Sequence, residues 1–277
     1  MNRSKNLVII ILLLGILISA CRKDKGDPPV LPPSGSFVID FSNFEPGKNS
    51  DNILLSKGIE NSNWEFSAVV AGYFRSLITT TLAVPVTAFQ RAASQSPAYL
   101  DDKTWQWKYN VSFLSTTYQA RLTGQTRTTD VLWKMYISAE GSSGFDEFLW
   151  FEGTSQIDGS SGKWSLNHSN QYQEPLLKIE WTEEIGETNY LKVKYTYERT
   201  LNDDRDDDPF NSSYIEYGRS SGVYDSYYNI YYYNGLKFSN MSVEWNSVTR
   251  NGRVKCSDFF GDDLWHCWDG NYVNITC

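Results

Sequence analysis

Two histidines and four cysteines are the residues of this chain best suited to nucleophilic or metal chemistry. His266 stands directly before Cys267, which suggests a thiolate–imidazole pair. Adjacent residues of a strand point to opposite faces, however, so these two side chains cannot act together as nucleophile and base there. Two histidines are also too few for a multi-histidine metal centre. The sequence therefore predicts no catalytic residue and no cofactor.

The N-terminus has the composition of an export signal. A basic start precedes an apolar run over residues 7–18, which is too short to span a bilayer. The sequence Ile18-Ser19-Ala20-Cys21 resembles a bacterial lipobox, in which the cysteine is lipidated and becomes the first mature residue. This resemblance implies a signal peptide over 1–20 and a membrane partner reached through lipidated Cys21. The alternative is an ordinary signal peptide in which Cys21 occurs by chance.

Residues 21–36 are charged at first and then rich in Pro, Gly and Ser, a composition that predicts a flexible tether. Without the signal peptide, 23 basic residues stand against 33 acidic ones, a net charge of −10. A short polar spacer before a β domain resembles the lipoproteins of the Bacteroidota. The resemblance implies a lipid-anchored protein of the cell envelope, at the outer membrane. Lys23-Asp24 matches the acidic signal for surface display only in part, so the periplasmic or surface side stays open.

Cys256, Cys267 and Cys277 are best explained as disulfide candidates, because export favours oxidation. If Asp269-Gly270 forms a two-residue hairpin turn, Cys277 lies too far along the ladder to reach Cys267. Cys256 would then pair with Cys267 or with Cys277, leaving one thiol free. A Cys267–Cys277 bond requires a looser hairpin.

An acidic run over residues 202–208 places oxygen-bearing side chains at alternating positions, which is the spacing of a calcium loop. The candidate ligands are Asp204, Asp206 and Asp208. The sixth position is Asp207 and the twelfth is Ser213, where such a loop has Gly and Glu. A solvated hairpin loop is therefore the favoured interpretation, and calcium is the alternative.

Aromatic side chains are the candidate ligand contacts. The stretch 224–233 places tyrosines on both faces of one strand, and an outward tyrosine can stack on a sugar ring or contact a partner. The candidates are Tyr227, Tyr231, Tyr233, Trp265 and Trp268. The favoured alternative is that these side chains fill the interior of the fold.

The C-terminal segment carries a second resemblance. Gly252-Arg253-Val254-Lys255, then Phe260-Gly261-Asp262, then Trp265-His266-Cys267-Trp268-Asp269 and a final cysteine resemble the ending of a group of uncharacterised Bacteroidota lipoproteins. The resemblance includes the aromatic strands before this ending, and so most of the chain after the tether. It supports a shared fold and adds nothing about mechanism.

From Trp105 onward, apolar and polar residues alternate with a period of two, which predicts antiparallel strands with one buried face. The predicted strands are 105–113, 118–123, 131–138, 147–152, 163–168, 176–182, 191–198, 214–217, 224–233 and 236–248. Short connections join them, so we expect a mainly β, up-and-down meander that closes into a barrel, because closure removes open edges. A β-sandwich is the alternative.

One helix precedes the strands. Apolar residues recur at helical spacing over about 63–84, and Ser62 or Asn61 can cap the start. Pro85 is expected to end or kink this helix, which we expect to pack on or in the barrel. A membrane span over 66–89 is the alternative, and Arg75 makes it costly. No second linker divides 37–277, so we expect a single β-rich domain.

Composition limits the function. The chain has 277 residues, is 15% aromatic and carries a net charge of −8, so nucleic acid is not an expected partner. We expect a non-catalytic envelope lipoprotein that binds an unknown ligand, a glycan or an envelope protein partner. The alternative is a glycan-active, carboxylate-dependent hydrolase. Its candidate acids, which nothing in the sequence pairs, are Asp146, Glu147, Glu180, Glu183 and Glu184.

Overall fold

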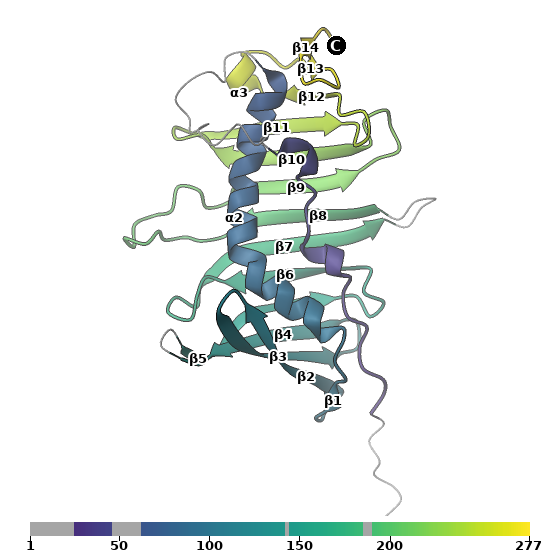
Figure 1. Cartoon of the computed structure of the whole chain (residues 1–277), viewed down its shortest axis with the longest axis vertical. Helices are drawn as coiled ribbons and strands as arrows, with labels where there is room; N and C mark the ends of the chain where they lie inside the picture. Colours follow the sequence, from purple (N-terminus) through teal and green to yellow (C-terminus); the bar gives the residue numbers. More distant parts are fainter. Residues whose placement is uncertain (1–24, 46–61, 142–143, 185–189) are drawn as a thin grey trace, which may run out of the picture.

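The computed structural model describes residues 25–45, 62–141, 144–184 and 190–277, and shows one long sheet crossed by one long helix (Figure 1). The helical elements are η1 (Ser34–Phe37), η2 (Ser42–Phe44), α2 (Asn63–Ala92) and α3 (Ser257–Phe260). The first strands are β1 (Ala98–Tyr99), β2 (Thr104–Phe113), β3 (Thr116–Thr126), β4 (Val131–Ala139), β5 (Phe145–Ser155), β6 (Ser161–Asn167) and β7 (Pro175–Glu184). The remaining strands are β8 (Tyr190–Tyr197), β9 (Tyr214–Arg219), β10 (Ser226–Tyr233), β11 (Phe238–Trp245), β12 (Gly252–Lys255), β13 (His266–Trp268) and β14 (Asn274–Ile275). The predicted signal peptide and Cys21 lie outside the described residues.

The strands follow one another across the sheet in sequence order, and each pairs antiparallel with the next. The predicted mainly β meander is therefore confirmed. The expected closure is not observed, because no pairing joins β1 to β14 within the described residues, and the sheet is open. Both outermost strands are only two residues long, which limits the backbone edge that they expose.

The alternating pattern of the sequence becomes one buried and one outer face. In β4, every second residue is buried, and Val131, Trp133 and Met135 have no exposed surface. Their neighbours Leu132 and Lys134 are half-buried on the opposite face. The inner face packs against α2 and the N-terminal segment, and Tyr, Trp and Phe rings supply much of its volume. Aromatic residues suit this arrangement because they fill a broad, half-buried pleated surface.

Helix α2 lies across the inner face from the C-terminal strands to the N-terminal ones, and contacts β12 and β13 near its start and β2 and β3 near its end. The Oγ of Ser62 accepts a hydrogen bond from the Glu65 N–H, which confirms the predicted cap. Its buried stripe runs at four-residue spacing through Phe66, Val70, Phe74, Ile78 and Leu82. Tyr73, which lies within the same apolar segment, is exposed and not part of this stripe.

The predicted end of the helix near residue 84 is wrong. The helix continues through a buried Pro85 to Ala92, and it changes direction in its C-terminal part (Figure 1). A proline inside a helix removes one hydrogen bond and bends the axis, and here the last turns follow β2. Among the described helices, α2 alone is long and apolar enough to cross a membrane by length and composition, and it packs against β2, β3, β12 and β13.

The N-terminal segment joins the fold earlier than predicted. Leu31 packs against the core, and Pro32 and Ser36 are buried, although they belong to the predicted tether. Residues 38–41 form no strand and connect η1 to η2. The ring of Phe37 stacks on Trp164 at 5.2 Å. This part of the chain therefore packs on the inner face of the sheet and does not extend its edge.

Candidate functional site

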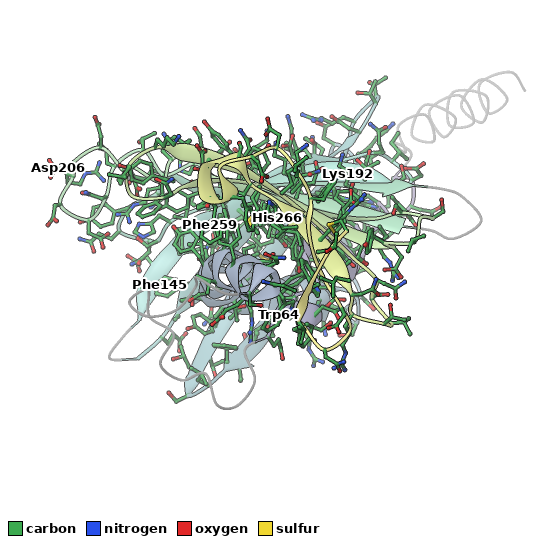
Figure 2. All side chains as sticks on the ribbon, turned by 90° about the horizontal axis from the view of Figure 1, so that it is seen from above. Trp64, Phe145, Lys192, Asp206, Phe259 and His266 are labelled. Atoms are coloured by element: carbon green, nitrogen blue, oxygen red, sulfur yellow. A yellow bond between two sulfur atoms is a disulfide. The ribbon has the colours of Figure 1, made fainter. Side chains whose placement is uncertain are left out.

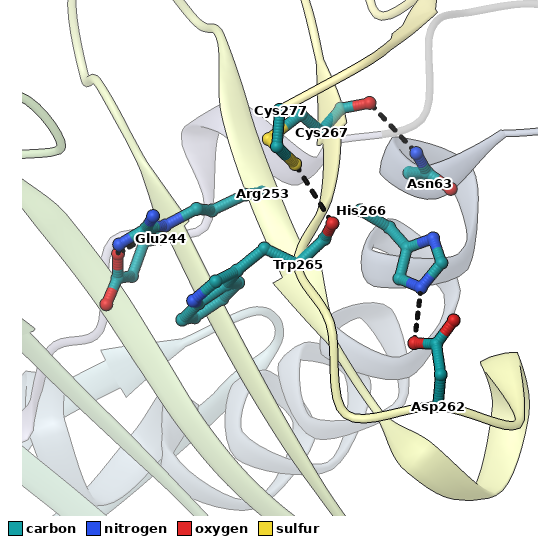
Figure 3. Close-up of a disulfide and its surroundings, with 8 residues drawn as sticks. All are labelled: Asn63, Glu244, Arg253, Asp262, Trp265, His266, Cys267 and Cys277. Atoms are coloured by element: carbon teal, nitrogen blue, oxygen red, sulfur yellow. Dashed lines mark hydrogen bonds and ion pairs between the residues drawn. A yellow bond between two sulfur atoms is a disulfide. The ribbon is translucent and has the colours of Figure 1, made fainter.

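The C-terminal disulfide joins Cys267 to Cys277, with 5.2 Å between their Cα atoms, while Cys256 is free (Figure 3). The sequence allows this pairing only if the hairpin is looser than a two-residue turn, and the structure shows such a looser hairpin. Cys267 pairs with Ile275 in the ladder, and residues 269–273 form the loop. The Asp269 carboxylate accepts hydrogen bonds from the N–H groups of Asn271 and Val273, which stabilises this wider loop. Cys277 then lies just beyond the last pair and reaches Cys267.

The histidine and cysteines of this region do not form a nucleophilic centre. The Nε2 of His266 lies 2.9 Å from Asp262 Oδ1, and its ring stacks on Phe260 at 3.7 Å. Its neighbour Cys267 is oxidised in the disulfide. Cys256 is 1% exposed, and burial raises the pKa of its thiol. A thiol that is buried and uncharged is a poor nucleophile and metal ligand.

The acidic loop does not assemble the predicted calcium ligands. Asp208 is 8% exposed and accepts hydrogen bonds from the Tyr197 hydroxyl and the Phe210 N–H. Asp204 and Asp206 are exposed, and Asp206 projects from the edge of the molecule (Figure 2). Within the described ranges, no three His, Cys, Asp or Glu side chains are grouped so that they could hold a metal ion.

Two of the candidate carboxylates of the alternative hydrolase are held by basic side chains. Glu147 accepts two hydrogen bonds from Arg121, and Glu180 forms an ion pair with Lys178 at 3.0 Å. A glycosidase needs one carboxyl group whose pKa is raised, so that it can donate a proton. In the described part of the chain, every carboxyl group whose pKa departs from its ordinary value has a lowered pKa.

The structure divides the five aromatic candidates. Trp268 is a core residue, which corrects the prediction: it is 1% exposed, and its Nε1 donates to the Arg250 carbonyl oxygen. Trp265 stays half-buried, with the Arg253 guanidinium 4.2 Å from its ring centre. Tyr227 lies over Gly218 of the neighbouring strand, where a Cβ would meet its hydroxyl at 2.3 Å.

The other two tyrosines belong to a row of rings on the outer face. The ring of Tyr231 lies between those of Tyr214, at 5.7 Å, and Phe238, at 4.7 Å, so both of its faces are covered. Tyr233 contacts Phe238 at 5.6 Å and donates its hydroxyl hydrogen to the Gly235 carbonyl oxygen. Both tyrosines therefore pack against neighbouring rings of the outer face, and neither is among the residues that line the hollow described next.

A polar hollow of about 200 Å³ lies beside this aromatic row on the outer face of β8–β11. Its lining side chains are Lys194, Tyr214, Glu216, Asn229, Asn240 and Ser242. The sequence predicted these strands but did not indicate any of the residues that line the hollow. The signal was present in the polar positions that alternate with buried ones, but only the register of four strands brings those positions together.

Three of these residues form one cross-strand row. Glu216 pairs with Asn229 and Asn229 pairs with Ser242 in the ladder. The Asn229 Nδ2 donates to Glu216 Oε1 at 3.3 Å, and the Ser242 Oγ donates to Asn229 Oδ1 at 3.4 Å. The long distances leave each group able to form shorter hydrogen bonds with a ligand. The row therefore presents oriented donors and acceptors side by side on a rigid sheet.

Two lysines set the electrostatics of the row. The Lys192 Nζ forms an ion pair with Glu216 Oε2 at 3.2 Å, and it lies on the outer face because Val193 beside it is fully buried (Figure 2). The Lys194 Nζ lies 3.9 Å from the ring centre of Tyr214. The carboxylate is thus balanced by nearby cations, and the hollow is polar without a strong net charge.

No family model, no curated protein and no solved structure matches this chain. The fold itself defines the class: a mainly antiparallel β protein with a sequential sheet and a single crossing helix.

Proposed function

We propose that this chain is a lipid-anchored lipoprotein of the bacterial outer membrane whose β domain binds a glycan without transforming it. The lipobox-like segment ending at Cys21 supports the anchor. The polar hollow on β8–β11 is the observation that carries the binding role, because it gathers an amide row, hydroxyls and a balanced ion pair on one outer face.

Sugar hydroxyls suit this hollow because each one can donate and accept a hydrogen bond at once. Asn229 and Asn240 offer both amide donors and carbonyl acceptors, and Glu216 offers acceptors. A site of about 200 Å³ is smaller than the ~300–1,000 Å³ of pockets that enclose a drug-sized ligand. It therefore fits one ring of an extended glycan that continues along the sheet.

The binding role is tested with a glycan array, followed by calorimetry on the glycans that bind. We expect Asn229→Ala to reduce affinity roughly tenfold, because it removes one donor and one acceptor and frees the partners on both sides. Gln119→Ala is the matched control, since the Gln119 amide also bonds a carboxylate, that of Glu140, on the outer face of β3. Equal losses in both variants, or an array without binding, contradict the proposal.

The anchor is tested separately with Cys21→Ala. We expect this variant to lose incorporation of labelled palmitate and to leave the membrane fraction, whereas Cys256→Ala keeps both. A Cys21→Ala protein that still labels with palmitate would refute lipidation at this residue and leave the glycan site untouched.

A further inference from the structure

A second hollow, of about 510 Å³, lies between the last turns of α2 and the first long strand of the sheet. Its lining residues are Thr87, Gln90, Arg91 and Ser94 of the helix and its end, and Asn110, Val111 and Ser112 of β2. It lies in the other half of the sheet from the hollow on β8–β11, since β2 is near the start of the strand order (Figure 1).

β2, which lines one side of this hollow, has no described partner strand along most of one edge. β1 pairs only with Trp105 and Gln106 of β2, whereas β3 pairs with the whole of β2 on the other side. No other described strand pairs with β2. Past Gln106, the edge of β2 that faces away from β3 therefore has no partner strand among the described residues.

The register identifies which backbone groups lie on that edge. The Thr104 carbonyl oxygen accepts from the Leu100 N–H, and the Thr104 N–H donates to the Asp101 carbonyl oxygen, so both Thr104 groups face away from β3. In an antiparallel strand, the N–H and C=O of one residue point to the same side, and the side alternates along the chain. β2 has no bulge in its register with β3. The N–H and C=O groups of Lys108, Asn110 and Ser112 therefore point to the unpaired edge.

Helix α2 lines the side of the hollow opposite β2, and a hydrogen bond joins the two elements. The Tyr109 hydroxyl donates a hydrogen bond to the Ala88 carbonyl oxygen, which ties α2 to β2 at this point. The exposed side chains of Gln90 and Arg91 border the hollow. A groove between an open strand edge and a helix is the geometry in which an extended peptide adds a strand to a sheet.

Charge indicates what kind of peptide fits. Arg91 forms no ion pair with any described residue, and it is the one charged side chain among the described residues that line the hollow. Among the described residues, no acidic side chain lines the hollow, although the chain has 33 acidic residues against 25 basic ones. The groove is thus locally cationic on an acidic protein, which favours a carboxylate in the ligand.

We propose that this groove is a strand-addition site, in which an extended peptide carrying a carboxylate pairs with the backbone of Lys108, Asn110 and Ser112 and places that carboxylate on Arg91. The occupant is a segment of a partner protein. This inference does not depend on the glycan site or on the lipid anchor, because it uses a different strand and a different face of the molecule.

The test is an affinity selection on the full-length protein with a library of random decapeptides that have free C-termini. Enriched peptides are then measured by fluorescence polarisation against two variants of one residue, Asn110→Pro and Asn110→Ala. Both variants lose the side chain, but only proline loses the N–H that faces the unpaired edge, and an edge position tolerates proline. We expect Asn110→Pro to weaken binding roughly tenfold and Asn110→Ala to change it less than about threefold.

Arg91→Gln tests the carboxylate. We expect this variant to weaken binding of acidic peptides roughly fivefold or more, and to bind their amide-capped or Gln-substituted forms as the wild type does. Equal binding by Asn110→Pro and Asn110→Ala overturns the proposal, as does a library without enriched peptides.

A measurement on the wild type keeps the proposal testable if Asn110→Pro fails to fold. In hydrogen exchange, an enriched peptide should newly protect the amides of Asn110 and Ser112, while the Val111 amide is already protected by β3. No new protection at Asn110 and Ser112 overturns strand addition. If size-exclusion chromatography with light scattering shows that this edge joins two copies of the chain, the partner-peptide occupant is wrong.

Discussion

Gly162 lies directly beneath the indole of Trp181, its partner across β6 and β7, and a Cβ at Gly162 would approach Trp181 Cη2 to 2.3 Å. The same relationship recurs along the sheet. A Cβ would approach the ring of a cross-strand tryptophan almost as closely at Gly124 with Trp133, Gly153 with Trp164, and Gly252 with Trp268. Each glycine makes room for a large ring that then fills the space between sheet and helix.

We predict that Gly162→Ala destabilises the fold by ~1–3 kcal/mol, because the added methyl group would overlap both the Trp181 ring and the Thr154 carbonyl oxygen. Gly72→Ala is the control, since Gly72 lies in α2 with nothing within 4 Å of its Cβ position. Alanine favours a helix over glycine, so this variant should gain ~0.5–1 kcal/mol. Urea denaturation measures the stability of both variants, and equal unfolding midpoints for the two would contradict the packing argument.

The strands were predictable because each carries its own signal. In β4 and β8, alternation alone places Trp133 and Val193 inside. The open sheet was not predictable, since closure depends on whether the first and last strands meet, and no local pattern encodes this. The end of α2 was missed for a related reason: packing against β2 outweighs the local effect of Pro85.

We predict that Cys277→Ser lowers the free energy of unfolding by ~2–3 kcal/mol, the value expected for a disulfide that closes a short loop. Cys277 is exposed, so the substitution tests the bond with little loss of packing. Chemical denaturation with and without reductant is the measurement. Reductant should lower the wild-type midpoint to that of Cys277→Ser and leave the variant unchanged.

Cys256→Ala serves as the control for the pairing. Because Cys256 is free, this variant should keep the full response to reductant. A loss of that response would mean that Cys256 takes part in the bond.

The candidate sites were less predictable than the fold. The hollow on β8–β11 depends on Glu216, Asn229 and Ser242, which come from three strands and meet only through register. A shift of one residue in any strand would turn its polar side chains to the other face. The disulfide depended on the loop at Asp269, whose carboxylate stabilises a turn wider than the two-residue hairpin that Asp-Gly suggests.

We predict a pH-dependent contribution from Glu147. The hydrogen bonds from Arg121 lower the pKa of this carboxyl group below its ordinary value of 4.5. The unfolded chain then binds the proton more readily, so the stabilisation is complete above the ordinary pKa and is lost as the pH falls through the lowered one. At pH 7, Glu147→Gln should cost no more than ~1 kcal/mol, because the pair is partly exposed.

Urea denaturation of both proteins at pH 7, 5 and 3 checks this. The difference in the free energy of unfolding between wild type and Glu147→Gln should shrink as the pH is lowered and be smallest at pH 3. Glu152→Gln is the control, since Glu152 lies 3.8 Å from Lys134 and should show a smaller difference at every pH. A difference that grows at low pH would contradict the assigned sign.

Finally, we predict that Cys256 reacts with iodoacetamide only when the domain opens. The Cys256 thiol is buried, and desolvation raises its pKa. Cys256 directly follows the last residue of β12. Alkylation requires both access and a thiolate, so the native protein should be protected at pH 8, and labelling should follow the unfolding transition in urea. Peptide mapping identifies the modified residue. Rapid native labelling at Cys256 would show that the C-terminal strands open independently of the rest of the sheet.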